Sequence, residues 1–373
     1  MNKCITSLIP ENIAPRGASR ILVYDSSGKL DGMIPLGRLA RSSAESDYGV
    51  CVLADIHIDK DKATEKTHRA LAYAEENCAF TCIAGDLTNQ GIEGDYVPYT
   101  NVVSQYKKPI FAIAGNHENY SGRDPQWLFE ATGRKPLYYS FGVNRMGEVV
   151  DEDMDKTPKK YREPVRDVYV MVGHYGGYDD SIASWRVNDF VSPEELQWFY
   201  ETLEANRDKR CFVFIHVLPL AHGVGDPNGL YTKRSPKVAG IWDVEEGIGK
   251  VVVALLCHYK NTILFHGHSH TKFELQRLDP KANYSNANGY RHLNVPSLAV
   301  PRDESGGALK DFPDDSEWYI MDVYDDYVIL DGRYFASGDE DGHWSALGTY
   351  KIDTPLQTVE AGTFVDETGL IRV

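Results

Sequence analysis

Five short segments of the chain carry side chains of the types that can bind metal ions or transfer protons. They are Asp55-Ile56-His57, Gly85-Asp86, Gly115-Asn116-His117-Glu118, His216 and Gly267-His268-Ser269-His270. Carboxylate, imidazole and amide donors together suit Mn, Fe(II) or Zn, whereas Ca and Mg sites use almost only oxygen. The ligand candidates are Asp55, His57, Asp86, Asn116, His216, His268 and His270. They are too many for one ion and predict two ions, about 3.5–4 Å apart with a shared carboxylate, an arrangement suited to displacement at phosphorus.

Each of these segments lies at or directly after an apolar run typical of a buried strand. The runs are YGVCVLAD (48–55), FTCIAGD (80–86), KPIFAIAGNHE (108–118), CFVFIHV (211–217) and TILFHGHSH (262–270). A helical pattern from Ala63 to Cys78 separates the first two runs, and Ser192-Pro193-Glu194-Glu195 is a capping-box start for another helix. This alternation predicts an α/β fold with a mainly parallel sheet. Ligands bind at the C-terminal ends of such strands, so all five segments are expected at one edge.

The spacing of the segments also argues against chance. Asp55 and Asp86 are 31 positions apart, and Asp86 and Asn116 are 30 apart (86 − 55 and 116 − 86), each about one strand-helix unit. A lone histidine at a strand end is usually a hydrogen-bonded structural residue, but five segments in this order are not explained that way. Three glycines, Gly85, Gly115 and Gly267, are expected to let the backbone turn tightly beside the site.

Near both ends of the chain, the pattern of apolar residues changes to one typical of β-hairpins. Residues 20–36 predict a β-hairpin that turns at Asp25–Gly28, and residues 37–47 a polar linker. After residue 317, two apolar runs around Asp325-Asp326 predict an antiparallel hairpin. We therefore expect an N-terminal appendage (1–47), a core (48–300) and a β-rich extension (301–373). Residues 144–190 and 222–248 are rich in Gly, Pro and Asp and predict long loops, where His174 and His222 are candidate substrate contacts.

Composition restricts the possible partners and the location. With 39 Lys and Arg against 55 Asp and Glu, the net charge is −16, which disfavours long nucleic acids and anionic membranes. The longest apolar run, Val251–Cys257, is far shorter than the roughly 18 residues of a membrane span. The N-terminal stretch lacks the apolar region of a signal peptide, and Cys51, Cys82 and Cys211 lie in strand-like runs. These features predict free buried thiols and a cytoplasmic location.

The ordered series D-x-H, GD, GNHE, H and GHxH resembles the signature of the calcineurin-like metallophosphoesterase superfamily over residues 55–270. The segment LADIH, the run QWFYETLE before FIHVLP and the late hairpin are most similar to its class III cyclic nucleotide phosphodiesterase and glycerophosphodiesterase branch. The resemblance implies a four-layer αββα sandwich, to which the two predicted hairpins would be added.

The resemblance also implies a function for each position. Asp55, His57 and His270 would bind the first metal ion, Asn116, His216 and His268 the second, and Asp86 would bridge them. His117 matches the family residue that reaches a phosphate oxygen and the leaving group. A hydroxide bridging the two ions would be the nucleophile.

Two departures separate the chain from relatives within the superfamily. Purple acid phosphatases have Tyr three residues after the bridging Asp, where this chain has Asn89. Ser/Thr protein phosphatases have GDxVDRG, and the corresponding segment here is GDLTNQG. We therefore expect a dinuclear-metal hydrolase of a small soluble phosphodiester. The alternatives are a phosphomonoesterase, a nuclease of the same superfamily, and a non-enzymatic attachment module that acts through the N-terminal hairpin; the sequence predicts no oligomeric state.

Overall fold

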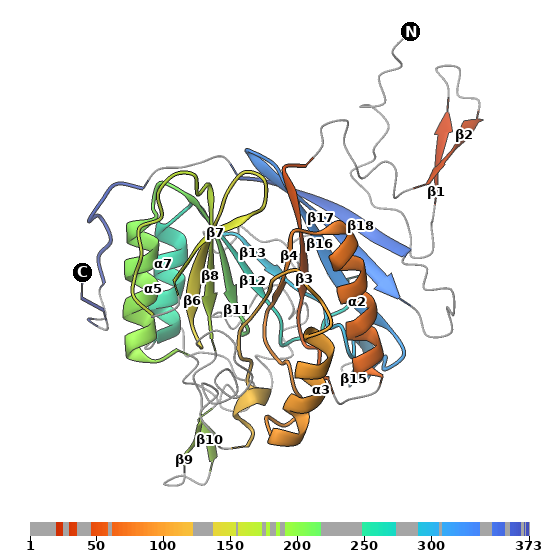
Figure 1. Cartoon of the computed structure of the whole chain (residues 1–373), viewed down its shortest axis with the longest axis horizontal. Helices are drawn as coiled ribbons and strands as arrows, with labels where there is room; N and C mark the ends of the chain where they lie inside the picture. Colours follow the sequence, from red (N-terminus) through yellow and green to blue (C-terminus); the bar gives the residue numbers. More distant parts are fainter. Residues whose placement is uncertain are drawn as a thin grey trace.

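The computed structural model describes residues 20–24, 30–35, 46–58, 62–121, 137–153, 156–173, 177–179, 184–186, 191–217, 248–273, 290–305, 308–335, 345–354, 359–366, 369 and 371–372. Two six-stranded sheets dominate this part of the chain, with helices beside them (Figure 1). The α/β fold class that the sequence predicts is confirmed.

The first sheet has the strand order β18-β17-β16-β3-β4-β5. Its parallel half consists of β3 (Tyr48–Leu53), β4 (Phe80–Ile83) and β5 (Ile110–Ala112), as predicted. The predicted C-terminal hairpin forms from β16 (Ser316–Val323) and β17 (Tyr327–Phe335), which turn at residues 324–326. Because β16 pairs antiparallel with β3, and β17 pairs with β18 (Ser345–Asp353), the C-terminal strands extend this sheet.

The second sheet has the order β13-β12-β11-β8-β6-β7. Four strands are parallel: β8 (Asp167–Val172), β11 (Arg210–Ile215), β12 (Thr262–His266) and β13 (His292–Asn294). The other two, β6 (Tyr139–Val143) and β7 (Val149–Asp153), are antiparallel. The predicted loop over residues 144–190 is wrong for β7 and β8, and also for two paired three-residue strands at Gly177–Asp179 and Ser184–Arg186. The run DVYVMV is fully buried in the sheet, and so short an apolar run is easily missed among Gly, Pro and Asp.

Helices cover the outer faces of the two sheets. Figure 1 shows α2 (Ala63–Asn77) and α3 (Glu93–Val103) beside the first sheet, and α5 (Pro193–Ala205) and α7 (Ile248–His258) beside the second. The predicted cap of α5 is present: Ser192 Oγ accepts a hydrogen bond from the Glu195 amide at 3.1 Å.

Side chains alternate between the layers along each strand. On β11, Phe212 and Phe214 belong to the core between the sheets, whereas Val213 and Ile215 pack in the core beneath α5 and α7. The core between the sheets is aromatic, and the rings of Phe141 and Tyr169 stack with their centroids 4.9 Å apart. This packing holds the two sheets against each other and aligns their strand ends.

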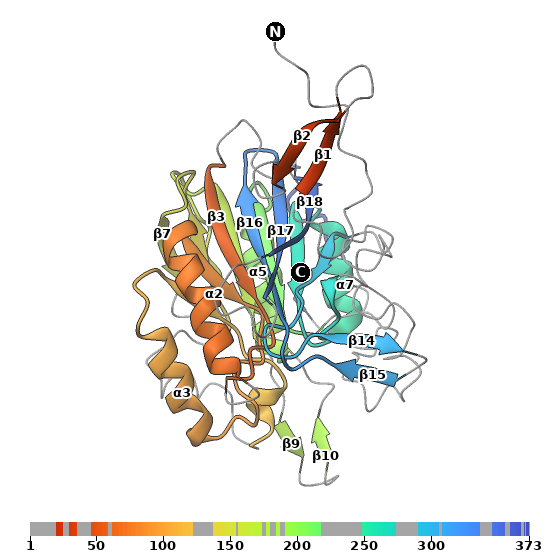
Figure 2. The same cartoon turned by 90° about the vertical axis from the view of Figure 1, so that its right-hand side faces the viewer.

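The remaining elements are small. The predicted N-terminal hairpin forms from β1 (Arg20–Tyr24) and β2 (Leu30–Pro35). Strands β9 (Gly177–Asp179) and β10 (Ser184–Arg186) pair, as do β14 (Arg302–Ser305) and β15 (Ala308–Asp311), and Figure 2 shows both pairs at the lower end of the sheets. Cys51, Cys82 and Cys211 are free and buried, as predicted. No helix in the described ranges has the length and apolar character needed to cross a membrane.

Candidate metal centre

The chemistry-bearing segments meet where strands of both sheets end. Asp55 and His57 follow β3, Asp86 follows β4, and Asn116 follows β5 just before the short helix η2 (His117–Asn119). His216 directly follows β11, while His268 and His270 follow β12. Backbone hydrogen bonds join the neighbouring turns: the His57 amide donates to Asp86 O at 3.0 Å, and the Gly267 amide donates to His216 O at 2.9 Å. The predicted convergence at one edge is therefore present.

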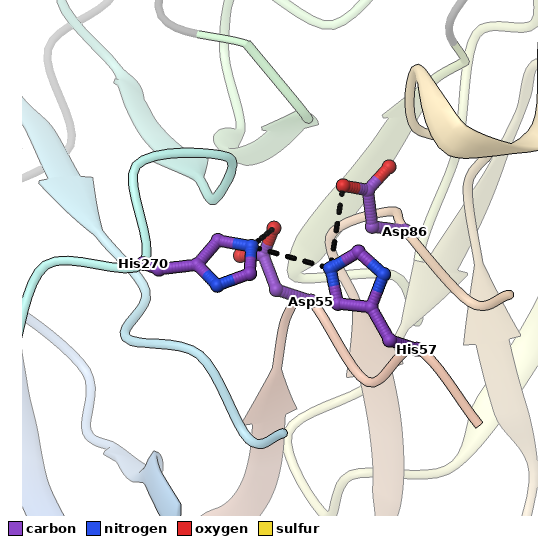
Figure 3. A group of neighbouring side chains, drawn as sticks. All are labelled: Asp55, His57, Asp86 and His270. Atoms are coloured by element: carbon purple, nitrogen blue, oxygen red, sulfur yellow. Dashed lines mark hydrogen bonds and ion pairs between the residues drawn. The ribbon is translucent and has the colours of Figure 1, made fainter. Parts of the chain in front are cut away.

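One group of donors consists of Asp55, His57, Asp86 and His270, all buried (Figure 3). His270 Nε2 lies 3.2 Å from Asp55 Oδ1 and 3.2 Å from His57 Nε2, and His57 Nε2 lies 3.7 Å from Asp86 Oδ2. Figure 3 shows the four side chains directed toward one another.

A second group consists of Asp86, His216 and His268. His216 Nε2 lies 3.2 Å from Asp86 Oδ2. Asn116 joins this group, because its Oδ1 lies 3.1 Å from His216 Nε2 and 2.8 Å from His268 Nδ1. All seven predicted ligand candidates thus lie in one cluster, and Asp86 belongs to both groups.

The donor atoms within each group lie within 4.8 Å of one another, close enough to surround a cation. Two imidazoles are oriented by backbone carbonyls: His216 Nδ1 donates to Ala84 O at 2.7 Å, and His270 Nδ1 donates to Val300 O at 2.9 Å. Each of these bonds fixes the ring so that Nε2 faces the cluster, which is the usual support of a metal-binding histidine. The mixed carboxylate and imidazole set fits Mn, Fe or Zn.

The backbone at the cluster is unusual. Five of its members have positive φ although none is glycine: Asp55 (52°), His57 (40°), Asp86 (52°), His268 (68°) and His270 (56°). Such residues cost about 1–3 kcal/mol each and concentrate at functional sites. The fold holds five ligand candidates in this unfavourable backbone conformation at one place, which marks the cluster as a functional site.

Glycines next to the cluster allow close approach. A Cβ atom on Gly85, which has φ +88°, would lie 2.5 Å from His216 Nδ1, and one on Gly267 would lie 2.6 Å from Asp55 Oδ2. Of the three glycines, Gly85 alone has the positive φ of the tight turn that we expected. Gly115 and Gly267 instead leave room for a ligand carboxylate.

Replacing Gly115 by Ala should disrupt the site. Its Cβ would lie 2.1 Å from Asp86 Oδ1 and 2.4 Å from the Asp86 amide nitrogen, so the backbone must move. We expect kcat/KM to fall by about 100-fold or more, as for a displacement of about 1 Å at a reacting centre, together with loss of bound metal. Gly94→Ala is the control, because nothing lies within 4 Å of the added atom. Wild-type metal content and turnover in Gly115→Ala would contradict this account of Gly115.

Electrostatics favour ionised carboxylates in the cluster. Burial by itself would raise the pKa of Asp86, but the His216 and His117 imidazoles outweigh it and hold that pKa well below its usual value. Burial likewise opposes the ionisation of Asp55, and His270 lowers its pKa overall. Both groups are therefore charged at neutral pH, as metal ligands must be.

The pKa values of the buried imidazoles shift in opposite directions. Burial would lower the pKa of His216, but the adjacent Asp86 carboxylate raises it to about 9. Burial dominates for His57, whose pKa is well below its usual value, and for His268, whose pKa falls to about 4. His57 and His268 are thus neutral at pH 7, with lone pairs available to a cation.

His117 lies at the open side of the cluster. Its side chain is 23% exposed, whereas those of Asp86 and His216 are at most 1% exposed. Its Nδ1 donates to Asn89 O at 2.7 Å, and its Nε2 faces Asp86 Oδ2 at 3.8 Å. The predicted proton-transfer residue is therefore oriented by a backbone carbonyl, with its second nitrogen toward the cluster.

Two further residues support this region. Tyr120 was not singled out in the sequence, although it stands four positions after Asn116. Its ring packs on His117 with centroids 4.2 Å apart, and its hydroxyl accepts a hydrogen bond from Asn116 Nδ2 at 2.9 Å. Glu118 accepts hydrogen bonds from Thr88 and from the Gly115 amide, and burial raises its pKa to about 8, with Asp86 adding to the rise. His174 and His222 lie outside the described residues.

This architecture and this donor set define an α/β protein with a buried cluster at the strand ends that can hold metal ions. The family model described as Calcineurin-like phosphoesterase matches residues 49–272, more than half of the 373 residues, so the chain belongs to that family. Family membership and the buried Asp and His cluster together indicate a metal-dependent phosphoesterase. No curated protein matches the chain.

Solved structures similar to this chain are distant. One, titled "GAP50 the anchor in the inner membrane complex of Plasmodium", has 13% identity and a TM-score of 0.47, covering 86% of this chain and 98% of that one. A single mutant of Vps29 from Entamoeba histolytica has 10% identity and a TM-score of 0.31, covering 82% and 98%. A hypothetical protein from Thermus thermophilus has 10% identity and a TM-score of 0.36, covering 82% and 100%.

Proposed function

We propose that this protein hydrolyses a small soluble phosphodiester with two divalent ions, Mn, Fe or Zn. The observation that carries the proposal is the pair of donor groups that share Asp86. A carboxylate common to two groups of donors is the arrangement by which two ions act on one phosphoryl centre.

In the proposed site, Asp55, His57 and His270 would hold one ion, Asn116, His216 and His268 would hold the other, and Asp86 would be shared by both. When bound, the ions supply an activated water at neutral pH and stabilise charge on the phosphoryl oxygens. The buried donors exclude bulk water from one side, so the phosphate must enter from the side where His117 is exposed.

His117 would act on the leaving group. With Nδ1 committed to Asn89 O, the Nε2 atom is the one available to a substrate oxygen. In that position it stabilises charge on the departing oxygen or donates a proton to it.

One feature favours a diester over a monoester. The chain lacks the Tyr of purple acid phosphatases and the Asp and Arg of protein phosphatases at residues 89 and 90. We place the substrate among cyclic nucleotides and glycerophosphodiesters.

The proposal extends to the size of the substrate, to further substrate contacts and to the location of the protein. The −16 charge favours a small substrate over a long nucleic acid. We propose His174 and His222 as additional substrate contacts. The free buried thiols support a reducing, cytoplasmic location.

The test compares bis(p-nitrophenyl) phosphate with p-nitrophenyl phosphate on protein reconstituted with Mn(II). We expect kcat/KM for the diester to exceed that for the monoester by about tenfold, a difference of about 1.4 kcal/mol in barrier. Removal of metal by EDTA should abolish turnover, and Mn(II) should restore it.

Each other outcome has a definite meaning. A monoester preference would replace the diester proposal with a phosphatase, and faster cleavage of a single-stranded oligonucleotide than of either small substrate would replace it with a nuclease. If the protein binds two ions and cleaves none of these substrates or cyclic nucleotides, hydrolysis is contradicted and an attachment module is favoured.

A further inference from the structure

Lys66 is a buried lysine on α2, with 2% of its surface exposed. Its Nζ donates to three backbone carbonyls: to Pro313 O and Asp315 O, each at 2.6 Å, and to Ala299 O. An ammonium group is costly to bury unless hydrogen bonds replace its water. The carbonyls supply these bonds, and they join α2 to two segments more than 230 positions further along the chain.

One of these segments, residues 297–300, contacts the first donor group directly. Ser297 Oγ and the Ala299 amide donate to Asp55 O, at 3.0 and 3.2 Å. The carbonyl of Val300 accepts the hydrogen bond from His270 Nδ1 at 2.9 Å, and the Val300 amide donates to Ser297 Oγ at 3.0 Å. Segment 297–300 therefore holds both the backbone of one ligand candidate and the imidazole of another.

The other segment, residues 312–315, reinforces the same unit. The Phe312 amide donates to Pro301 O at 3.0 Å, and Lys272 Nζ donates to Asp315 Oδ2 at 2.8 Å. Since Lys272 lies two residues beyond His270, this segment also restrains the loop that carries His270.

The second donor group is supported differently. His216 is oriented by Ala84 O and Asn116 by Tyr120, and within the described ranges no hydrogen bond given for these two side chains involves segment 297–300. His268 is linked to that segment only through Asp55, because its amide donates to the two Asp55 carboxylate oxygens at 3.1 and 3.0 Å. Loss of the Lys66 contacts should therefore act on one group more than on the other.

We propose that Lys66 is a positioning residue for the first metal ion, acting through segment 297–300 on Asp55 and His270. This inference rests on the proposed binding of two ions. A hydrogen-bond partner behind a ligating histidine sets the ring orientation, and its loss typically costs 10- to 100-fold in metal affinity.

The test uses Lys66→Met, which keeps an unbranched apolar stem and removes the donor. Binding of Mn(II) or Co(II) to metal-free protein is titrated by calorimetry, without substrate. We expect one ion to bind about 10-fold more weakly, the lower end of the range for loss of a direct partner, because Lys66 bonds Ala299 O and not the Val300 carbonyl that contacts His270. The other ion should bind as in the wild type. Turnover should need more Mn(II), with kcat close to the wild-type value once metal is saturating.

Lys209→Met is the matched control. Lys209 is also a buried lysine that donates to a backbone carbonyl, Val165 O at 2.8 Å. Lys209 lies just before the start of β11, and Val165 lies just before the start of β8. This contact is therefore at the N-terminal ends of the strands, opposite the cluster. Binding of both ions should be unchanged in this variant.

Equal binding of both ions by Lys66→Met and the wild type would overturn the proposal, as would an equal loss of both ions. If Lys66→Met fails to fold by circular dichroism, Ser297→Ala tests the same segment. It should weaken the same single ion, and unchanged binding would overturn the proposal. The role of Lys66 is judged from the calorimetry alone. If the wild type binds two ions but shows no turnover, only the proposed hydrolase function is contradicted. If the wild type binds fewer than two ions, the proposed function and the role of Lys66 are both overturned.

Discussion

Replacing Asp86 by Asn should lower kcat/KM for a phosphodiester by about 10³-fold, or about 4 kcal/mol of transition-state stabilisation. Asp86 belongs to both donor groups, and its Oδ2 lies 3.2 Å from His216 Nε2 and 3.7 Å from His57 Nε2. An amide of the same shape keeps one acceptor oxygen but removes the charge that the two ions would share. We therefore expect the variant to bind at least one ion more weakly and to lose the coupling between them.

The measurement combines turnover with metal content on the same preparation. Asp322→Asn is a suitable control, because Asp322 is a partly buried aspartate on β16 that pairs with Gly49, at the start of β3 and away from the strand ends that carry the site. It should keep wild-type metal content and turnover. If Asp86→Asn turns over substrate at the wild-type rate, the shared-carboxylate mechanism is wrong.

The second large effect is expected at His117. His117→Gln should lower kcat by about 10²- to 10⁴-fold, the usual contribution of a positioned proton donor, and should retain both ions. The reason is geometric: His117 is oriented by Asn89 O, is partly exposed where Asp86 is buried, and directs Nε2 toward the cluster. Glutamine can still donate a hydrogen bond there but cannot transfer a proton.

A series of aryl methyl phosphates with phenols of rising pKa separates proton donation from simple charge stabilisation. The loss in His117→Gln should grow as the leaving phenol becomes more basic, since a poor leaving group needs the proton most. His258→Gln is the control, on a histidine at the end of α7 that contacts Thr363. A loss of equal size along the whole series would rule out proton donation, and loss of an ion would make His117 a ligand instead.

The sequence predicted the ligand candidates and the strands that precede them, because both depend on short-range patterns. A buried strand appears in the sequence as a short apolar run. A ligand candidate directly after such a run lies at the strand end, because its position depends only on the local sequence. The same reasoning failed for β8, whose five apolar residues stand alone in a polar stretch. Its place was decided by β6 and β11, which pair with it on either side.

The identity of the ligand candidates and the edge at which they meet were thus determined by the sequence alone. Tertiary structure decided how each is supported. A lysine on a helix is normally expected in solvent, yet Lys66 is buried because carbonyls distant in the chain converge on it. Gly115 looked like a turn residue and instead makes room for Asp86, 29 positions earlier (115 − 86). Such contacts join residues far apart in the chain, and no local pattern predicts them, because they exist only once neighbouring strands have paired and the layers have packed together.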